Sequence, residues 1–584
     1  MKAMKYMKYT EILSLNRELE TVLKGKKFLI ALLSNIVVNQ LKEVLELELR
    51  QQGINAEVIV GEYDNIVQDS SRLSEVNAVL IFWEAPNWVE GLNARIMSMN
   101  VDEISALKER FESEIDLVSK NLQHTPLVLF NRFSSLLFST DVLRDGPLSL
   151  LCRQLNIVLE KSVSRNQLVV DINAILAKVG LGAAVDFRQF HSSKALYTIN
   201  YFKVYASAVA PALRAAAGRS KKVLVLDCDN TLWSGVLGED SESGIQMDDS
   251  SLKGKIFREV QQILHGFRQE GILLALCSKN NPADVDHVLN SHPDMIIRDD
   301  DLVAKKVNWQ DKATNLRELA TELNLGLDSF VFVDDSSFEL GLIEKELPMV
   351  KCAQVPKNLS EYPALLSELK QDFFTLSPTA EDGRKTELYL QEQQRKKQAA
   401  QSDSIDEYLA SLELRLTILW DEDIPISRAA QMTQKTNQFN FTTRRYTEAD
   451  IQRMLEDKDY TSSVFSLADR YGDYGVTGLI IIKTDRTSPS KALIDSFLMS
   501  CRVIGRNVEY AFFDQIVLSL QQKNITELRA EYHATPKNSQ VAQLYDNYGF
   551  KRIATIEGRR EYLISLADYK PRSIEYISIN LKGN

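Results

Sequence analysis

The sequence has few cysteines. Five are present in 584 residues, an odd number, and they lie far apart with no CxxC pair. A disulfide framework needs paired cysteines and a thiolate zinc site needs close spacing, so neither is indicated. We therefore expect a protein of a reducing, cytoplasmic compartment.

Long hydrophobic runs are also missing. No segment offers the roughly 18 uninterrupted apolar residues of a membrane-spanning helix. The opening stretch MKAMKYMKYTEILSLNRELE has early lysines, but acidic residues follow soon and there is no apolar core of signal-peptide length. We expect neither export nor a membrane partner.

Basic side chains do not cluster along the chain. Lys and Arg number 69 against 80 Asp and Glu, which gives a formal net charge of -11. Affinity for a phosphate backbone comes from clustered Lys and Arg, so a general nucleic-acid binder is excluded. A chain that is 44% hydrophobic and 26% charged has an ordinary globular composition, and this one is too long for a single domain.

The first block, residues 1–215, alternates short apolar runs with helical patterns. KKFLIALLSNIVV is followed by the helix-like VNQLKEVLELELRQQG, then by AEVIVGEY, NAVLIFWEA and TPLVLFNRF. This alternation predicts an α/β domain with a parallel sheet and helices on both faces. Ligands bind at the carboxyl ends of such strands, where Ser34 and Asn35 fall.

The LSN run at Ser34 and Asn35 has two interpretations. It resembles the amino-terminal region of longer FkbH-like proteins, which is similar to SGNH hydrolases. A serine nucleophile needs a histidine base held by a carboxylate. The candidates, His191 with Asp171 or Asp186, lie in no DxxH pattern. The run is either a strand-end turn of a degenerate SGNH-like domain or a ligand or catalytic site.

The second block, residues 220–370, begins with VLVLDCDNTLWSGVLGED. An apolar strand ends there at Asp227 and Asp229, on either side of Cys228. A rigidly held carboxylate suits a nucleophile, and a second carboxylate two residues on can exchange protons at the same reacting atom. Because side chains alternate along a strand, Cys228 is expected to point into the packing.

Three further elements follow in order. Ser278 closes the strand GILLALCSKN, Lys312 lies in VNWQDKATNL, and Asp334 and Asp335 close SFVFVDDSSFE. A hydroxyl and an ammonium bind phosphoryl oxygens, and acidic residues at a strand end hold Mg²⁺. The pattern therefore indicates a phosphorus electrophile.

These four elements resemble the motifs of the haloacid dehalogenase (HAD) superfamily of phosphatases. The resemblance implies a Rossmann-like core in which Asp227 is the nucleophile that forms an aspartyl-phosphate and Asp229 is the acid/base. The substrate phosphate would be held by Thr231, Ser278 and Lys312. Only a short flap, residues 233–250, separates the first two motifs, so the resemblance implies a minimal cap over an open site.

The metal site is part of the same resemblance. Mg²⁺ would be bound by Asp227, by the backbone carbonyl of Asp229, and by Asp334 or Asp335. The substrate implied by the four motifs is a phosphorylated small molecule.

Residues 371–404 form a helical linker. Its sequence, running into ELYLQEQQRKKQAAQSDSIDEYLASL, is polar and has no Pro or Gly, which predicts an exposed spacer helix. The third block, residues 405–570, then mixes strands such as VTGLIIIKT with helices and predicts an α+β domain.

The third block contains FLMSCRVIGRNVEYAFFDQIV, a strand that runs into a turn and then a helix. Backbone amides at a Gly-containing turn and a helix start bind pyrophosphate. The run Arg502, Gly505, Arg506 resembles the R/QxxGxG/A turn of GNAT acyltransferases, with Asn507 where that family has a small residue. The two arginines alternatively form surface ion pairs.

A second signature follows in PKNSQVAQLYDNYGF, where the resemblance places Asn538 and Tyr545 beside the thiol of an acyl carrier. The implied ligand is coenzyme A or a phosphopantetheine arm. Cys501 precedes the turn, and Arg502 with the helix start would favour its thiolate. It is either an acyl-carrying nucleophile or a buried structural cysteine.

The fusion of these two blocks closely resembles the FkbH-like family over about residues 220–560. Besides the motifs above, QKTNQFNFTTRRYT and LADRYGDYGVTG carry this resemblance. It implies dephosphorylation of an acyl donor of the 1,3-bisphosphoglycerate type. The glyceryl or related acyl unit would pass to the phosphopantetheine thiol of an acyl carrier protein, in polyketide or other secondary metabolite biosynthesis.

Two other functions stay open. The first is a HAD phosphatase whose GNAT-like domain acylates an amine or a sugar nucleotide from acyl-CoA. The second is a scaffold that binds a carrier protein without turnover, which the complete set of phosphatase motifs disfavours. If Asp227 attacked an acyl phosphate at phosphorus, the acyl group would leave as the free acid. Acyl transfer therefore needs a thiol at the carbonyl carbon.

Overall fold

The computed structural model describes most of the chain, and its residues divide into two compact units. The first unit is Met1–Gly218 with Arg445–Arg453, and the second is Arg219–Arg444 with Met454–Asn584. The described residues are 4–139, 143, 145–164, 166–376, 384–399, 404–556 and 558–582.

The first unit is built on a five-stranded sheet of order β2-β1-β3-β4-β5, in which every neighbouring pair is parallel. This confirms the parallel sheet predicted from the alternating pattern. The strands are β1 (Phe28–Ser34), β2 (Ala56–Val60), β3 (Ala78–Phe82), β4 (Val128–Asn131) and β5 (Gln167–Val170).

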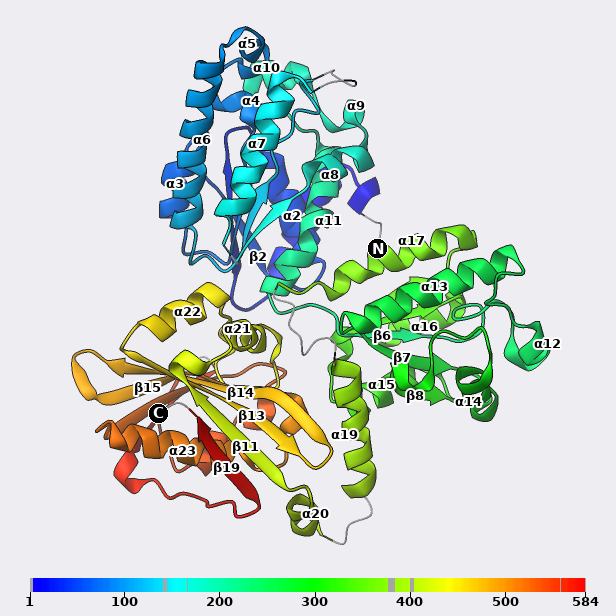
Figure 1. The fold of residues 1–584 in the computed structure, drawn as a ribbon, viewed down its shortest axis with the longest axis vertical. Coiled ribbons are helices and arrows are strands. Elements are labelled where there is room, and N and C mark those ends of the chain that lie inside the picture. The colour runs from blue at the N-terminus through cyan, green and yellow to red at the C-terminus, as the bar shows by residue number, and fades with distance from the viewer. Residues whose placement is uncertain are drawn as a thin grey trace. The chain divides into compact units, whose positions relative to one another are not determined.

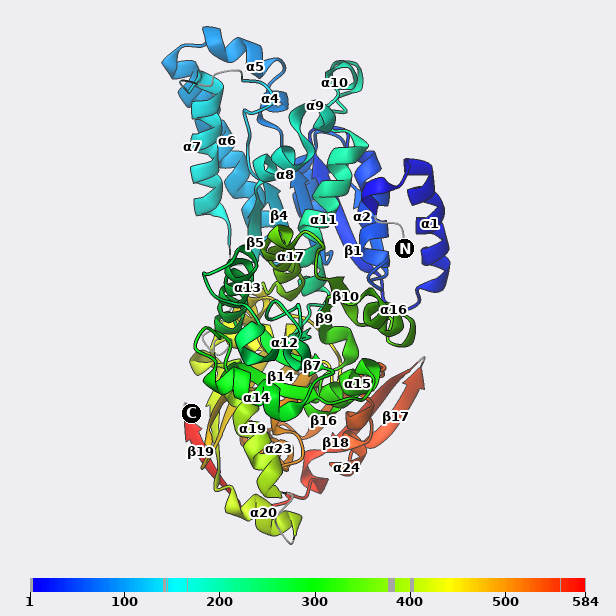
Figure 2. The same ribbon diagram turned by 90° about the vertical axis from the view of Figure 1, so that its right-hand side faces the viewer.

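Helices cover both faces of this sheet (Figures 1 and 2). On one side lie α6 (Val101–Asn121) and α7 (Pro147–Ser162), and on the other α2 (Asn39–Arg50) and α11 (Ile199–Ala216). Each helix buries a stripe of apolar residues at three- and four-residue spacing, which is the pattern of a core-facing helix. In α6 the stripe is Phe111, Ile115 and Val118, all fully buried against the strands.

Polar side chains gather at the carboxyl edge of this sheet. Asn35 donates from Nδ2 to the carbonyl of Glu84 at 2.9 Å, and its Oδ1 accepts from the Glu84 amide at 2.8 Å. The Ser34 hydroxyl donates to the Ile36 carbonyl at 2.8 Å. Both side chains therefore form hydrogen bonds to backbone groups at the strand ends. This is what the interpretation of the LSN run as a strand-end turn predicts.

The two aspartates weighed as partners for Ser34 have structural roles. Asp171 accepts from the amides that begin α8 (Ile172–Val179), and Asp186 accepts from an amide of α10 (Phe187–Ser193). Both aspartates are therefore helix caps. The His191 side chain is exposed on α10.

Glu84 generates a testable pH dependence. The residue is 4% exposed, burial raises the pKa of its carboxyl to about 7, and the hydrogen bond from Tyr197 at 2.6 Å opposes the rise. When folding raises the pKa of a carboxyl, the free energy of unfolding falls as the pH rises from the ordinary pKa of that group through its pKa in the folded protein. We expect Glu84→Gln to be more stable than the wild type at pH 8 by about 3 kcal/mol, and to lose this advantage near pH 4.5.

Urea unfolding at both pH values measures this difference. Glu57→Gln is the matched control, because Glu57 is partly exposed and pairs with Lys27 at 2.5 Å. Equal pH dependence in wild type and Glu84→Gln would contradict the assignment.

The second unit contains two sheets, and the first is again parallel, with the order β10-β9-β6-β7-β8. Its strands are continuous apolar runs, which is typical of a parallel sheet buried on both faces. They are β6 (Val223–Leu226), β7 (Leu273–Ser278), β8 (Leu302–Val307), β9 (Phe330–Asp334) and β10 (Lys351–Gln354).

Helices cover this sheet as well. The apolar residues of α13 (Leu252–Gln269) and α17 (Tyr362–Leu369) pack on one face, and those of α15 (Lys312–Glu322) and α16 (Ser337–Glu346) on the other. Figures 1 and 2 both show α13 and α17 on the side of the strands opposite α15. Because β6 lies between β9 and β7, the carboxyl ends of these three strands meet at one edge.

The second sheet of this unit is mostly antiparallel, with the order β17-β18-β16-β15-β14-β13-β11-β19. Two neighbouring pairs, β15 with β16 and β11 with β19, are parallel. The predicted mixture of strands and helices is confirmed, and α23 (Val508–Gln522) packs on the sheet (Figure 1). The strands are β11 (Leu414–Trp420), β13 (Tyr460–Asp469), β14 (Gly472–Asp485), β15 (Ser488–Met499), β16 (Glu527–His533), β17 (Lys551–Ile556), β18 (Arg559–Ser565) and β19 (Ile577–Lys582).

The predicted linker is helical, with α19 (Lys385–Ala399) and α20 (Ile405–Ser411). The expectation of an exposed spacer is wrong at Arg395, which is 1% exposed. Its Nε and Nη2 donate to the two carboxylate oxygens of Asp469 at 2.6 and 2.8 Å, and its guanidinium lies 4.3 Å from the ring centre of Tyr474. This two-point ion pair fixes α19 to the antiparallel sheet.

Among the helices that the structure describes, none has the length and apolar character needed to cross a membrane.

Candidate active site

Three charged residues meet at the carboxyl edge of the parallel sheet in the second unit. Asp227 directly follows β6, Lys312 begins α15, and Asp334 ends β9. The Lys312 ammonium lies 2.6 Å from Asp334 Oδ2 and 3.1 Å from Asp227 Oδ1. All three side chains are buried. The strand order thus brings together residues that are more than one hundred positions apart in sequence.

The same edge has the donors for a metal ion. Asp227, Asp334 and Asp335 each place a carboxylate oxygen within 4.8 Å of the others. No hydrogen bond from the described residues reaches Asp227 Oδ1, which has only the ion pair with Lys312. Hard carboxylate oxygens are the ligands that Mg²⁺ prefers. The residues present therefore fit the magnesium ion that the motifs imply.

The protonation of these carboxyls reflects crowded negative charge. Burial raises the pKa of Asp227 to about 6, and the Asp334 carboxylate adds to the rise while Lys312 opposes it. Burial, and then the neighbouring Asp334, also raise the pKa of Asp335. One ammonium does not neutralise three carboxylates, so the cluster favours a bound cation.

The predicted phosphate-holding residues lie on the adjoining elements. Ser278 ends β7 and is 1% exposed. Thr231 is fully buried, and its Oγ1 has no hydrogen-bond partner among the described residues. The prediction that Cys228 points into the packing is confirmed, since it is fully buried in the apolar core.

Asp229 accepts three hydrogen bonds. Its Oδ1 accepts from the indole Nε1 of Trp233 and from the amide of Leu237, both at 3.0 Å. Its Oδ2 accepts from Nδ2 of Asn280 at 2.8 Å. Sequence reasoning missed Trp233 and Asn280 as site residues, although each lies within a few positions of a motif, in DNTLW and CSKN.

The predicted turn of the third block follows β15. Cys501–Val503 is a short 3-10 helix, Gly505 has a φ of +85° with open space where a side chain would stand, and Cys501 is partly exposed. Asn507 precedes α23 with a φ of +60°. Asparagine tolerates this left-handed conformation better than most residues, which accounts for its presence where the resemblance expects a small residue.

Arg502 and Arg506 differ in exposure. The Arg506 side chain is 4% exposed, and its guanidinium lies 4.8 Å from the ring centre of Tyr474. Arg502 is partly exposed, and its Nε lies 3.4 Å from the Ser500 hydroxyl. Of the two cations, Arg502 is therefore the more accessible to a ligand.

Asn538 and Tyr545 are both buried. The amide Nδ2 of Asn538 donates to the carbonyls of Asn440 and His533 at 2.8 and 2.9 Å. Tyr545 packs against Phe441 at 4.3 Å between ring centres, and its hydroxyl has no hydrogen-bond partner among the described residues. Asn538 thus holds the backbone, while the Tyr545 hydroxyl has unused hydrogen-bonding capacity.

The polar segment QKTNQFNFTTRRYT lies between two strands of the sheet. β15 and β16 pair from Lys491 with Glu527 to Ile494 with Ala530. Beyond that point β12 (Phe439–Asn440) pairs with the end of β15, and the His533 amide donates to the Phe441 carbonyl at 2.8 Å. The residues of β12 and Phe441 therefore bridge β15 and β16 where these two strands diverge.

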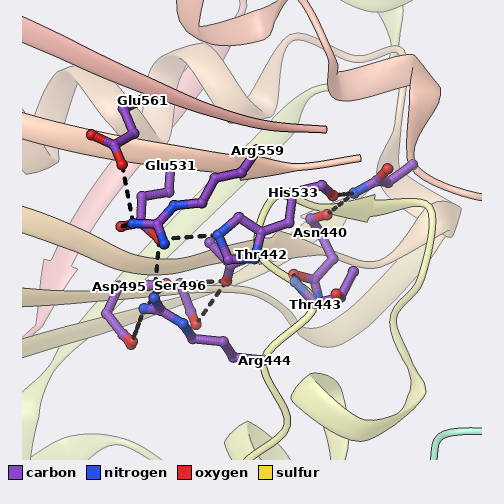
Figure 3. Close-up of polar contacts among 11 residues, drawn as sticks. Asn440, Thr442, Thr443, Arg444, Asp495, Ser496, Glu531, His533, Arg559 and Glu561 are labelled. Carbon is purple, nitrogen blue, oxygen red and sulfur yellow. Dashed lines mark hydrogen bonds and ion pairs between the residues drawn. The ribbon is translucent and has the colours of Figure 1, made fainter. Parts of the chain in front are cut away.

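An ionic cluster fixes this segment in place (Figure 3). Arg444 donates to Asp495 Oδ2 at 2.7 Å and to Glu531 Oε2 at 3.1 Å. Glu531 also accepts from Arg559 at 2.5 Å, and it lies 3.0 Å from Nε2 of His533. The Arg444 side chain of this segment is therefore bound by carboxylates of the same chain.

The chain is similar in fold to solved structures. No family model and no curated protein matches the chain. Among solved structures, the N-terminal part of the protein BF1531 from Bacteroides fragilis, described as containing a phosphatase domain complexed with Mg, has 24% identity and a TM-score of 0.55. It covers 64% of this chain and 100% of its own. This share of the chain has the fold of that protein.

Two other neighbours are acetyltransferases. A putative acetyltransferase of the GNAT family from Desulfovibrio desulfuricans has 12% identity and a TM-score of 0.21, and covers 26% of this chain and 99% of its own. The PaiA N-acetyltransferase from Thermoplasma acidophilum, solved in complex with coenzyme A, has 18% identity and a TM-score of 0.17, and covers 20% and 66%. With such scores they stand only as structural neighbours.

The carboxylate cluster leads to a prediction about magnesium. We expect Mg²⁺ to raise the unfolding temperature, because a ligand at about 100 times its Kd stabilises a protein by about 2.7 kcal/mol. If Asp335 rather than Asp334 is the ligand, Asp335→Asn should gain much less from Mg²⁺, since it removes one ligand. Without metal this variant should be at least as stable as the wild type, because it relieves repulsion. Thermal unfolding with and without Mg²⁺ measures both effects.

Asp300→Asn is the matched control for this prediction. Asp300 is exposed just before the amino end of β8, at the opposite edge of the sheet from the cluster. It should respond to Mg²⁺ like the wild type. An unchanged magnesium response in Asp335→Asn alone would assign the ligand to Asp334, and an unchanged response in Asp227→Asn as well would argue against a metal at this cluster.

Proposed function

We propose that this chain is a cytoplasmic, bifunctional enzyme of the FkbH-like type. It dephosphorylates an acyl donor of the 1,3-bisphosphoglycerate type and transfers the glyceryl or related acyl unit to the phosphopantetheine thiol of an acyl carrier protein. The observation that carries the phosphatase half is the buried ammonium of Lys312 between Asp227 and Asp334. The Mg-complexed phosphatase-domain protein that shares this fold supports it.

The domain assignment belongs to the same proposal. Residues 1–215 form a degenerate SGNH-like domain, residues 220–370 a HAD-like phosphatase domain with a minimal cap, and residues 405–570 a GNAT-like acyltransferase domain. Residues 371–404 connect the last two. The parallel sheet in each of the first two domains supports this division.

In the phosphatase half, a carboxylate oxygen of Asp227 attacks the phosphorus of the donor's ordinary phosphate monoester, not that of its acyl phosphate, and the bond from phosphorus to the leaving alkoxide oxygen breaks. Asp229 gives a proton to that oxygen, and then takes one from the water that hydrolyses the aspartyl-phosphate. Lys312 and Ser278 hold phosphoryl oxygens, with Thr231 at the base of the motif turn. Mg²⁺, held by Asp227, Asp334 or Asp335 and the Asp229 carbonyl, supplies the positive charge that lets an anionic phosphate approach.

In the acyl-transfer half, a thiolate attacks the carbonyl carbon of the acyl phosphate, the bond from that carbon to the phosphate oxygen breaks, and inorganic phosphate leaves. The acyl group keeps its activation as a thioester. The thiol belongs either to Cys501 or to the carrier arm itself. The arm lies on the turn from Arg502 to Asn507, where Gly505 leaves the backbone open. Its phosphate is met by Arg502, while the buried guanidinium of Arg506 packs over the Tyr474 ring. Asn538 and Tyr545 border the carrier thiol.

A second candidate is acylation of an amine or a sugar nucleotide from acyl-CoA. The observation that favours it is the pair of His533 and Glu531, at 3.0 Å, with the histidine side chain 32% exposed and the glutamate 10% exposed. A histidine oriented by a buried carboxylate suits removal of a proton from an attacking amine.

Asp227→Asn tests the phosphatase half. We expect it to abolish phosphate release from a small phosphate monoester in Mg²⁺, because an amide is a poor nucleophile and a weaker metal ligand. The fold, followed by circular dichroism, should be intact. Asp300→Asn again serves as the acid-to-amide control and should keep full activity. Near-normal phosphate release by Asp227→Asn would remove the basis of this assignment.

Arg502→Ala tests the carrier site. Loss of a charge-assisted phosphate contact is worth roughly 1.5 to 3 kcal/mol, so carrier affinity should fall about 10- to 150-fold. Intact-mass analysis of an acyl carrier protein incubated with enzyme, Mg²⁺ and an acyl phosphate measures loading. Arg529→Ala, at a 54% exposed site on β16, is the matched control. If Arg502→Ala loads the carrier normally, the amine or sugar nucleotide becomes the better acceptor.

Cys501→Ser separates the two thiol routes. If Cys501 carries the acyl group, this variant stops carrier loading and shows no acyl-enzyme adduct in the mass spectrum. If the carrier thiol attacks directly, loading continues with modest slowing. In both cases hydrolysis of the small monoester should continue, because the four phosphatase motifs are unchanged. Loss of both activities would contradict the proposed division of labour.

A further inference from the structure

Trp233 connects the apolar core to the carboxyl of Asp229. The indole ring is fully buried in the core cluster that also contains Leu226, Phe257 and Leu276. Its one polar atom, Nε1, donates to Asp229 Oδ1 at 3.0 Å. Because the ring is packed on all sides, this donor has a fixed position.

The turn between Asp229 and Leu237 is equally well defined. The amide of Asn230, which has a φ of +51°, donates to the Gly235 carbonyl at 3.3 Å, and its Oδ1 accepts from the Gly235 amide at 3.1 Å. Gly235 has a φ of +109°, a conformation that favours glycine. This closed turn delivers the Leu237 amide to Asp229 Oδ1 at 3.0 Å.

The second carboxylate oxygen is held from another strand. Asn280 follows β7 and is 5% exposed, and its Nδ2 donates to Asp229 Oδ2 at 2.8 Å. The same nitrogen lies 3.5 Å from the Ser278 hydroxyl. Asp229 is therefore restrained at both oxygens, by two segments that are about 45 residues apart in sequence.

We propose that Trp233 and Asn280 are positioning residues that orient the Asp229 carboxyl for proton transfer to the leaving oxygen. The proposal rests on the phosphatase function proposed above. In the first step the bond from phosphorus to the ester oxygen breaks and Asp229 gives its proton to that oxygen. In the second step Asp229 takes a proton from the attacking water. Neither Trp233 nor Asn280 exchanges a proton.

This role predicts a dependence on the leaving group. An alkoxide is a poor leaving group and needs the proton from Asp229 as the bond breaks, whereas p-nitrophenolate leaves without it. A misoriented Asp229 therefore slows phosphoryl transfer from alkyl phosphates to Asp227 and spares transfer from p-nitrophenyl phosphate, while the later hydrolysis of the aspartyl-phosphate is the same for both esters. A defect that merely loosens the fold slows both esters alike, so the ratio of the two rates reports on Asp229.

The test compares kcat/KM for glycerol phosphate and for p-nitrophenyl phosphate in Mg²⁺, because kcat/KM reports the first phosphoryl transfer and excludes the later hydrolysis of the aspartyl-phosphate, in which Asp229 also takes part. In Trp233→Phe, which keeps an aromatic ring and loses the N–H donor, we expect the alkyl ester to slow about 10- to 100-fold and the aryl ester by less than about 3-fold. Asn280→Ala should shift the ratio in the same direction. Asp229→Asn lacks the acid altogether, so its ratio of aryl-ester rate to alkyl-ester rate is the upper limit for the other variants.

Trp309→Phe is the matched control, since Trp309 is 75% exposed in the same domain and should leave both rates unchanged. Thermal unfolding establishes that each variant is folded. If Trp233→Phe does not fold, the ratio measured in Asn280→Ala tests the positioning role. Equal slowing of both esters, or no slowing of either, would overturn the inference. If the wild type released phosphate from neither ester, the phosphatase proposal itself would fall.

Discussion

The buried ion pair network of Lys312 with Asp227 and Asp334 is the constraint around which the parallel sheet of the second unit is organised. Although burial lowers the pKa of Lys312, the two carboxylates outweigh it and raise that pKa. A buried charge without a partner is expensive, so the strand ends and the start of α15 must keep their places. Asp311 caps α15 by accepting from the Thr314 amide at 2.8 Å, which presents Lys312 to the cluster. An excess of negative charge remains, and this makes the site suitable for a divalent cation, without which the carboxylates would repel an anionic substrate.

The antiparallel sheet relies on ion pairs for a different purpose. Arg395 joins the linker helix to Asp469, and Arg444 joins the β12 segment to Asp495 and Glu531. These pairs match each cation with one or two carboxylates and hold segments in place, whereas three carboxylates share one ammonium in the Asp227 cluster.

Sequence reasoning could predict the parts of this molecule that are encoded locally. Apolar runs gave the correct parallel strands, and the order of Asp227, Ser278, Lys312 and Asp334 at strand and helix ends predicted their meeting, because parallel strands end at a common edge. Contacts between distant segments leave no local pattern. Trp233 and Asn280 could not be recognised as partners of Asp229, and a polar helix such as α19 gave no sign that Arg395 would be buried. Likewise, β12 takes its position because β15 and β16 diverge, and this divergence is not visible in the sequence of any one of the three segments.

The central claim is that Asp227 receives the phosphoryl group. Rapid acid quench of the enzyme during turnover of a ³²P-labelled phosphate monoester in Mg²⁺, followed by peptide mapping, tests this directly. The account predicts a hydroxylamine-labile phosphate on the peptide that contains Asp227, and its absence from Asp227→Asn. Turnover without any phosphoenzyme, or label on a different residue, would contradict it.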